Sequence, residues 1–298
     1  MRIVVNTPNG NIGRSLTLQL LEKGAKVVGI ARSPGKLADL IARGLEVIEG
    51  STDDPAVLAR AFAGADAVFW LTPPAFRPDF REWTRATARA GADAVKAQGV
   101  KRVVVLSSLG AQTGPGSGPV GVLLDIEETF KAAAPDVTVL RPGYFMENIL
   151  QSVGTIAQAG SIFMPIPADK KFPMVATADI AAKGAEVLLD SKWKGHRIVG
   201  VHGPTDLTYR EVASLLTEAL GKPVSYVEVS VDQARQGMVG AGLPDFVADM
   251  YAEMYGAILA GRMDAAEPRS AETTTPTALL TFARETIRPA VEQASAAR

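Results

Sequence analysis

The chain of 298 residues contains no cysteine and only two histidines. Without cysteine, disulfides, thiol catalysis and cysteine-bound zinc are all excluded. The two histidines, His196 and His202, flank a predicted strand at 197–201, and so small a number argues against a histidine-rich metal site. We therefore expect no metal, and we interpret both histidines as structural.

A charge excess of either sign is also lacking. The sequence has 31 basic and 32 acidic residues, a formal net charge of -1, and nothing that predicts a nucleic-acid partner or an anionic membrane surface. No apolar run approaches the roughly 20 residues that span a bilayer. The chain starts directly with a strand-like run, without the pattern of a signal peptide. These features predict a cytoplasmic globular protein with a large core.

The first half of the sequence alternates short apolar runs with helical patterns. Mostly apolar runs suit strands that are covered on both faces, and the alternation implies parallel crossovers. We therefore predict an α/β fold, with a Rossmann-like doubly wound parallel sheet over residues 1–150 and a smaller mixed α/β lobe over 151–298 packed on it. The six predicted strands are "RIVVN", "KVVGIA", "LEVIEG", "AVFWLT", "RVVVLSS" and "VTVLRP".

The second half is less regular. It predicts a helix at 178–189, a strand in "PVSYVEV" and a loop in "RSAETTTPTA". Thr208 and Glu211 have the spacing of a capping box, which predicts the start of a helix. The apolar residues of 237–261 form either one wall of an apolar substrate pocket or a face for helix packing or dimer contact.

The stretch "VVNTPNGNIG", residues 4–13, lies between the first predicted strand and the first predicted helix. Gly10 and Gly13 permit close approach of the backbone to an anion at a helix N-terminus, as a phosphate cradle requires. Thr7 occupies a position where a dinucleotide-binding loop usually carries glycine, and Pro8 removes one N–H donor. The two interpretations are a phosphate cradle and an ordinary turn between strand and helix.

The residues at the end of the second predicted strand indicate whether the site prefers NAD(H) or NADP(H). An NAD-selective site usually places a carboxylate there for the ribose 2′-hydroxyl. This chain has Arg32 instead, with Lys36 four residues on. Because arginine holds a phosphate bidentately, the sequence favours NADP(H) over NAD(H). The alternative is that both are solvated surface charges.

With these residues, the chain resembles the NmrA-like branch of the atypical short-chain dehydrogenase/reductases, and in particular its NAD(P)H:quinone and azo-dye reductase members. The blocks that carry the resemblance run in family order and span nearly the whole chain. They are "NGNIG", "GSTDDPAVLARAFAGADAVFWLTPP", "VKRVVVLSSLGA", "LRPGYFMENI" and "KGHRIVGVHGPTDLTYREVASLL". The family usually has glycine at position 7 and an acidic residue at position 51, where this chain has Thr7 and Ser51.

The resemblance implies a set of cofactor-binding residues at the carboxyl ends of the predicted strands. Arg32 and Lys36 would meet the 2′-phosphate, and Ser51 and Thr52 would approach the adenine. The pyrophosphate would be lined by Thr7, Asn9, Gly10, Asn11, Ile12 and Gly13; the ribose side by Thr72 and Pro73; and the nicotinamide by Ser107, Ser108, Pro142, Gly143 and Tyr144.

The catalytic residues are less clearly marked, because none of the five tyrosines starts the Tyr-x-x-x-Lys pair of standard short-chain dehydrogenases. One hypothesis is a reductase of a small apolar or aromatic acceptor, quinone-like or azo, without metal or flavin. In it Tyr144 or water supplies the proton and Ser107 or Ser108 holds the acceptor oxygen. The other is a non-catalytic NAD(P)-binding redox sensor that regulates a protein partner. Either is compatible with a monomer or a homodimer.

Structural roles remain the alternatives for these side chains. Ser107 and Ser108 can simply end a strand and begin a turn. Tyr144 can be a core aromatic. Asp125 and Glu127, in the helix where the Tyr-x-x-x-Lys pair would lie, are expected on a solvated helix face.

Overall fold

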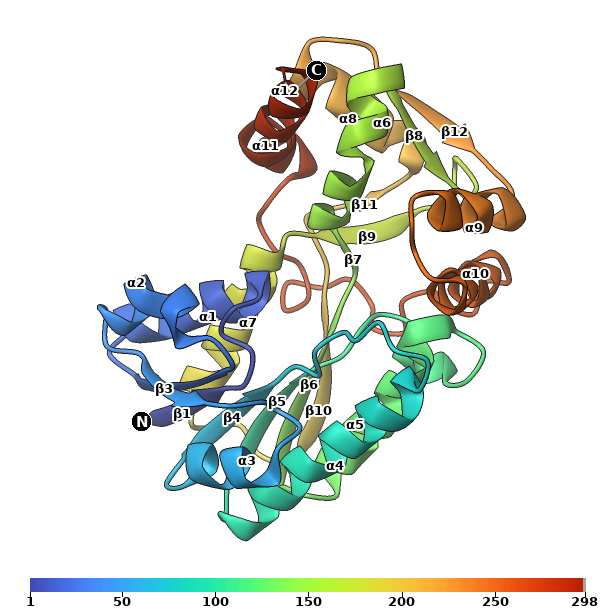
Figure 1. Ribbon diagram of the computed structural model, residues 1–298. Coiled ribbons are helices and arrows are strands. Elements are labelled where there is room, and N and C mark those ends of the chain that lie inside the picture. Colours follow the sequence, from blue (N-terminus) through green and yellow to red (C-terminus); the bar gives the residue numbers. More distant parts are fainter. Residues whose placement is uncertain (297–298) are drawn as a thin grey trace. The chain divides into compact units, whose positions relative to one another are not determined.

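The computed structural model describes residues 1–296, and the chain forms two compact units (Figure 1). The first unit comprises Met1–Ala111, Val122–Arg141 and Ala178–Val199. The second comprises Gln112–Gly121, Pro142–Thr177 and the chain from Gly200 onward. The chain thus leaves the first unit and returns to it. Within residues 1–296, no helix is long and apolar enough to cross a membrane.

The first unit is built on a seven-stranded sheet with the strand order β10-β6-β5-β4-β1-β2-β3. All pairings from β6 through β3 are parallel. The strand order reverses between β1 and β4, so the predicted doubly wound, Rossmann-like sheet is confirmed. The strands are β1 (Arg2–Val5), β2 (Lys26–Ala31), β3 (Glu46–Glu49), β4 (Ala67–Trp70), β5 (Arg102–Leu106), β6 (Asp136–Pro142) and β10 (His196–Val201).

Two successive residues of β4 show how both faces of this sheet are covered. Phe69 lies against the face of α1 and α7, close to Gly184, and Trp70 lies against the opposite face, close to Gly91 of α4 and Phe130 of α5. Both aromatic side chains are fully buried. Figure 1 shows the cause, since the sheet lies between α1 and α7 on one face and α3, α4 and α5 on the other. The helices of this unit are α1 (Asn11–Glu22), α2 (Ala38–Ile41) after the 3-10 turn η1 (Pro34–Leu37), α3 (Pro55–Phe62), α4 (Phe80–Ala97), α5 (Leu123–Lys131) and α7 (Thr177–Leu189).

The second unit contains a three-stranded sheet, ordered β11-β9-β7, and a two-stranded sheet of β12 and β8. Its strands are β7 (Tyr144–Phe145), β8 (Ser161–Met164), β9 (Phe172–Val175), β11 (Asp206–Leu207) and β12 (Ser225–Glu228). Its helices are η4 (Met146–Ser152), α6 (Val153–Ala159), α8 (Tyr209–Leu220), α9 (Val231–Gly240), α10 (Asp245–Leu259), α11 (Leu279–Phe282), η5 (Ala283–Ile287) and α12 (Arg288–Ala296); the short turns η2 (Ala111–Thr113) and η3 (Gly118–Val122) precede α5.

Several helix starts follow from their first residues. The Asp54 carboxylate accepts a hydrogen bond from the N–H of Ala56 at 2.8 Å and so caps α3. Thr208 and Glu211 form the predicted capping box at the start of α8. The predicted loop at 269–278 contains neither a helix nor a strand.

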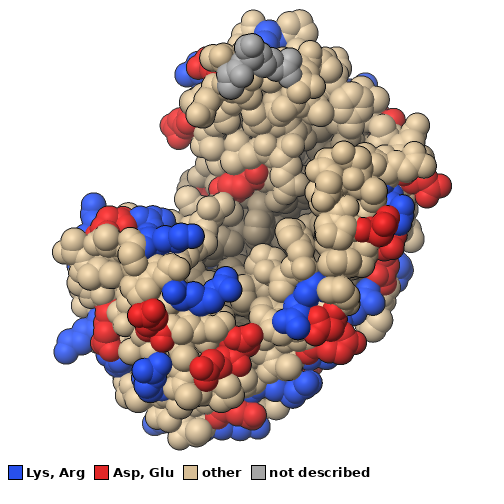
Figure 2. Space-filling view, viewed as in Figure 1, with Lys and Arg blue, Asp and Glu red and all other residues tan. Residues whose placement is uncertain are grey.

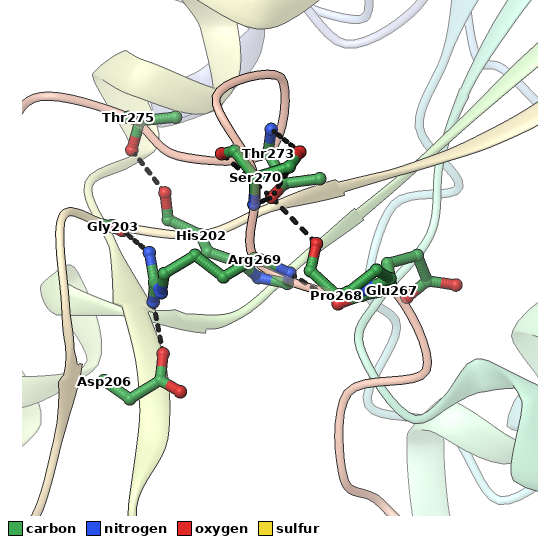
Figure 3. A network of polar contacts seen from close by, with 9 residues as sticks. All are labelled: His202, Gly203, Asp206, Glu267, Pro268, Arg269, Ser270, Thr273 and Thr275. Carbon is green, nitrogen blue, oxygen red and sulfur yellow. Dashed lines mark hydrogen bonds and ion pairs between the residues drawn. The ribbon is translucent and has the colours of Figure 1, made fainter.

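That loop is tied to His202 by the polar network in Figure 3. The backbone N–H of His202 donates to the Thr273 carbonyl at 2.7 Å, and the Thr275 N–H donates to the His202 carbonyl at 2.8 Å. The imidazole Nε2 lies 3.1 Å from the Glu267 carbonyl oxygen, and Arg269 pairs with Asp206. The His202 ring is buried within this network.

Candidate functional site

The glycine-containing loop joins β1 to α1 at the point where the strand order reverses. Asn6, directly after β1, is buried and makes two hydrogen bonds to the end of β4. Its amide nitrogen donates to the Leu71 carbonyl at 2.9 Å, and its amide oxygen accepts from the Leu71 N–H at 2.9 Å. These bonds link the ends of β1 and β4, the two strands between which the order reverses and beside which ligands of such sheets bind.

Gly13 is the glycine of this loop that the fold requires. A Cβ at this position would lie 1.9 Å from the Thr7 carbonyl oxygen, so only glycine lets α1 start this close to β1. Gly10 differs, because a Cβ there would be 3.9 Å from the same oxygen and its φ of -79° suits any residue. The open space beside the Gly10 backbone is therefore available to a ligand.

The structure explains why Thr7 and Pro8 are tolerated. Thr7 does not have a positive φ, since within residues 1–296 only glycines do. Pro8 is buried, and its ring lies against Gly29 of β2, where a Cβ would be 2.8 Å from the proline Cγ. The proline thus packs under the loop, where it fills the space that Gly29 leaves.

The start of α1 fits a phosphate group. No side chain caps the helix and its first turn contains no acidic residue, so its positive dipole end is not neutralised. The Thr7 hydroxyl is shielded from water and has no hydrogen-bond partner among the described residues. A buried hydroxyl without a partner is costly, and an anionic ligand would satisfy it. Asn9, Gly10 and Asn11 are exposed, whereas the Ile12 side chain is buried in the core.

Arg32 and Lys36 follow the end of β2, and both side chains are exposed. Ser51, which follows β3, hydrogen-bonds to the Asp53 carboxyl group and lowers its pKa. The indole N–H of Trp83 donates to an Asp53 carboxylate oxygen at 3.1 Å, and this bond and the charge of Arg32 also lower that pKa. Thr52 is buried. Asp53 and Trp83 are therefore polar residues of this edge that the sequence did not single out.

Thr72 and Pro73 follow β4 and are partly buried. The Thr72 hydroxyl accepts a hydrogen bond of 2.8 Å from the indole nitrogen of Trp70. Its own proton remains available to a ligand, so this contact is compatible with the role that the resemblance implies.

A buried ion pair lies at the carboxyl ends of β5 and β6. Arg141 donates from Nε and Nη2 to the two Glu127 carboxylate oxygens, at 3.0 and 2.7 Å, and the Glu127 side chain is fully buried. The Ser107 hydroxyl donates to the same carboxylate at 2.5 Å. The expectation of a solvated helix face is therefore wrong for Glu127, although it holds for Asp125, which is exposed and pairs with Arg85.

The sequence contained a signal for this pair. Arg141 is the single charge inside the apolar run "VTVLRP", and a charge in a strand that is covered on both faces needs a buried partner. Ser108, the next residue after Ser107, is partly buried and donates to the Leu109 carbonyl at 3.0 Å.

Pro142, Gly143 and Tyr144 carry the chain into the second unit. The Gly143 N–H donates to the Val201 carbonyl at 3.0 Å, and a Cβ on Gly143 would lie 2.5 Å from the Pro173 carbonyl oxygen. Tyr144 is partly buried within a cluster of aromatic rings, 5.7 Å from Phe172 and 6.3 Å from Tyr209 between ring centroids. Burial raises the pKa of the Tyr144 phenol, which therefore stays protonated at neutral pH.

Three comparisons with known proteins agree with this fold. The chain matches the NmrA-like family over residues 1–275. It is 32% identical to an NAD(P)H azoreductase of Xenophilus azovorans over 85% of this chain and 86% of that protein, and 28% identical to quinone oxidoreductase 2 of Escherichia coli over 84% and 86%. The NADP(H) complex of a Citrobacter triphenylmethane reductase has the same fold, with a TM-score of 0.80 at 23% identity over 99% of this chain and all of that one.

These matches define the class of protein. The chain belongs to the NmrA-like family, a group of proteins with a Rossmann-like sheet.

Proposed function

We propose that the chain is an NAD(P)H-dependent oxidoreductase that prefers NADPH and reduces a quinone-like or azo acceptor. The azoreductase and quinone oxidoreductase relatives support the reaction class. The observation that carries the proposal is the start of α1, where Gly13 lies against the Thr7 carbonyl and the buried Thr7 hydroxyl has no partner among the described residues. The uncapped helix N-terminus would hold the pyrophosphate there.

The preference for NADPH is supported by the side chains next to this loop. Arg32 is exposed at the end of β2, where a carboxylate would favour the 2′-hydroxyl of NADH, and Lys36 adds a second positive charge. Both would hold the 2′-phosphate. Basic and acidic side chains are interspersed on the face in Figure 2, so the preference depends on these local charges rather than on a large basic surface.

The reduced nicotinamide would supply the hydride when it is bound. Reduction of a quinone also needs a proton, and the protonated Tyr144 phenol is our proposed source. The partner implied is a small aromatic molecule.

The test is a titration of the purified protein with NADPH and NADH, followed by NADPH oxidation with a panel of quinones and azo dyes. Tight NADPH binding with turnover supports the proposal. Binding without turnover contradicts the enzyme and supports the redox sensor, for which the missing Tyr-x-x-x-Lys pair is the argument. Absence of binding contradicts both.

A further inference from the structure

The contact between Ser107 and Glu127 restricts what Ser107 can do. A serine hydroxyl carries one proton and two lone pairs, whereas an ionised carboxylate only accepts. Arg141 donates to both Glu127 oxygens, which is the geometry of a charge-assisted pair with an ionised carboxylate. The single Ser107 proton is therefore held by Glu127 in a bond of 2.5 Å, and only lone pairs remain for a ligand.

This arrangement excludes one role considered for Ser107. The carbonyl oxygen of a quinone and the nitrogens of an azo group are acceptors, so they need a donor. Ser107 cannot be that donor while its proton is bound to Glu127. The family resemblance implies that the nicotinamide lies beside Ser107, at the carboxyl end of β5. The hydrogen-bond donors of the nicotinamide ring system are the two N–H groups of its carboxamide.

We propose that Ser107 accepts a hydrogen bond from the nicotinamide carboxamide, and that the buried Glu127–Arg141 pair is the device that holds Ser107 in this acceptor orientation. Glu127 is then a positioning residue, which acts through Ser107 without touching the cofactor. A buried pair suits this task, because packing holds both side chains in place. The Arg141 side chain is 4% exposed and the Glu127 side chain 0%. The inference rests on the proposed function, since it requires that the chain bind a nicotinamide.

The probe is reduced 3-acetylpyridine adenine dinucleotide phosphate, in which a methyl group replaces the carboxamide NH₂ and the rest of NADPH is unchanged. The dissociation constants of NADPH and of this analogue are measured by quenching of tryptophan fluorescence. Wild-type protein should bind NADPH about tenfold more tightly, the factor that one hydrogen bond provides. This ratio does not change when a variant merely loosens the site, because both ligands then lose affinity equally.

Ser107→Ala should reduce the ratio to about 1. Glu127→Gln should also reduce it, since an amide can donate to the serine and no longer fixes its proton. The matched control is Glu128→Gln on the same helix, where the carboxylate is exposed and pairs with Lys131; it should keep the wild-type ratio. Glu127→Gln leaves the buried Arg141 without its carboxylate and can prevent folding. If this single variant does not fold, the double variant Glu127→Gln, Arg141→Met, which buries no charge at either position, takes its place.

The outcomes separate the inference from the proposed function. If wild-type protein does not bind NADPH, the proposed function fails. If NADPH binds but the wild-type ratio is about 1, or if Ser107→Ala keeps the ratio, the contact with the carboxamide is wrong. If Ser107→Ala reduces the ratio and neither Glu127 variant does, the positioning role of Glu127 is wrong.

Discussion

The indole ring of Trp70 lies directly against Gly91 of α4, where a Cβ would be only 2.5 Å from two of the ring carbons. The ring is fully buried, and its centroid lies 5.0 Å from that of the Phe130 ring. Trp70 is therefore a core residue whose fit depends on a glycine 21 positions later in the sequence.

Replacing this glycine should destabilise the first unit. In Gly91→Ala the gain in helix propensity, about 1 kcal/mol, is outweighed by the overpacking against Trp70, which costs about 1–3 kcal/mol or more for so close a contact. The midpoint of urea unfolding should fall. The matched control is Gly237→Ala within α9, where a Cβ would meet nothing within 4 Å. This substitution should raise the stability, because it gains helix propensity without a clash. Equal effects at both sites would contradict the contact.

The two glycines of the α1 loop should respond differently to substitution. Gly10→Val should fold with wild-type stability to within about 1 kcal/mol, because φ at this position is ordinary and the added Cβ has space. It should nevertheless abolish binding of both NADPH and NADH by filling the cradle. Gly13→Ala should lower stability itself, since its Cβ would collide with backbone. Thermal unfolding and cofactor titration distinguish the two, and cofactor binding by Gly10→Val would refute the cradle.

Arg32→Ala should weaken NADPH binding about 10- to 100-fold, which is the loss of a hydrogen-bonded charge pair. NADH binding should change little, because NADH has no 2′-phosphate. Arg43→Ala serves as the control, because this arginine forms an exposed surface pair with Glu22. A variant that loses equal affinity for the two cofactors would exclude Arg32 from contact with the 2′-phosphate.

Tyr144→Phe should lower kcat about 100-fold or more if the phenol supplies the proton, while NADPH binding stays unchanged. Because burial raises the pKa of this phenol, its ionisation should produce no loss of kcat between about pH 6 and 9. Tyr255→Phe, in the same unit, is the control. A Tyr144→Phe variant with full kcat would leave water as the proton donor.

Stability should fall in mild acid because of His202. Burial lowers the pKa of this imidazole, although Asp206 and Glu267 favour its charged form and Arg269 opposes it. Below the unfolded-state pKa of about 6.5, the unfolded chain binds a proton that the folded chain does not bind. The free energy of unfolding therefore decreases as the pH falls from about 6.5 toward the lower folded-state pKa, by at most about 1.4 kcal/mol per pH unit.

Urea unfolding at pH 7.5 and 5.5 measures this difference. The variant His202→Gln should show a smaller decrease than wild-type protein. His196→Gln, which changes an exposed ring, should behave as wild type. An identical decrease in all three proteins would assign the acid sensitivity to other groups.

The sheet of the first unit could be predicted because its strands have a clear sequence signal. A run such as "RVVVL" is apolar throughout, and β-branched residues that are buried on both faces occur in few other settings. The short strands of the second unit could not be predicted in this way. Two-residue strands such as β7 and β11 have no periodicity, and their pairing depends on contacts far away in the sequence.

The candidate site was predictable to a different extent in its different parts. The loop at Gly10 and Gly13 is local, so its spacing indicated its position before α1. The Ser107–Glu127–Arg141 group is not local, since it joins the ends of two strands to the middle of a helix. Whether Glu127 faces solvent or the core depends on the orientation of α5 on the sheet, and the prediction of a solvated face was wrong because residue type alone does not give that orientation.

The double hydrogen bond between Asn6 and Leu71 has a consequence for ligand affinity. Because the amide of one side chain spans the reversal point, the ends of β1 and β4 keep their separation before any ligand arrives. A dinucleotide entering this crevice would not have to order the two strand ends. The conformational entropy for that ordering is spent during folding, so more of the contact energy remains for affinity. Through this bond, Asn6 would preorganise the receptor for the dinucleotide of the proposed function.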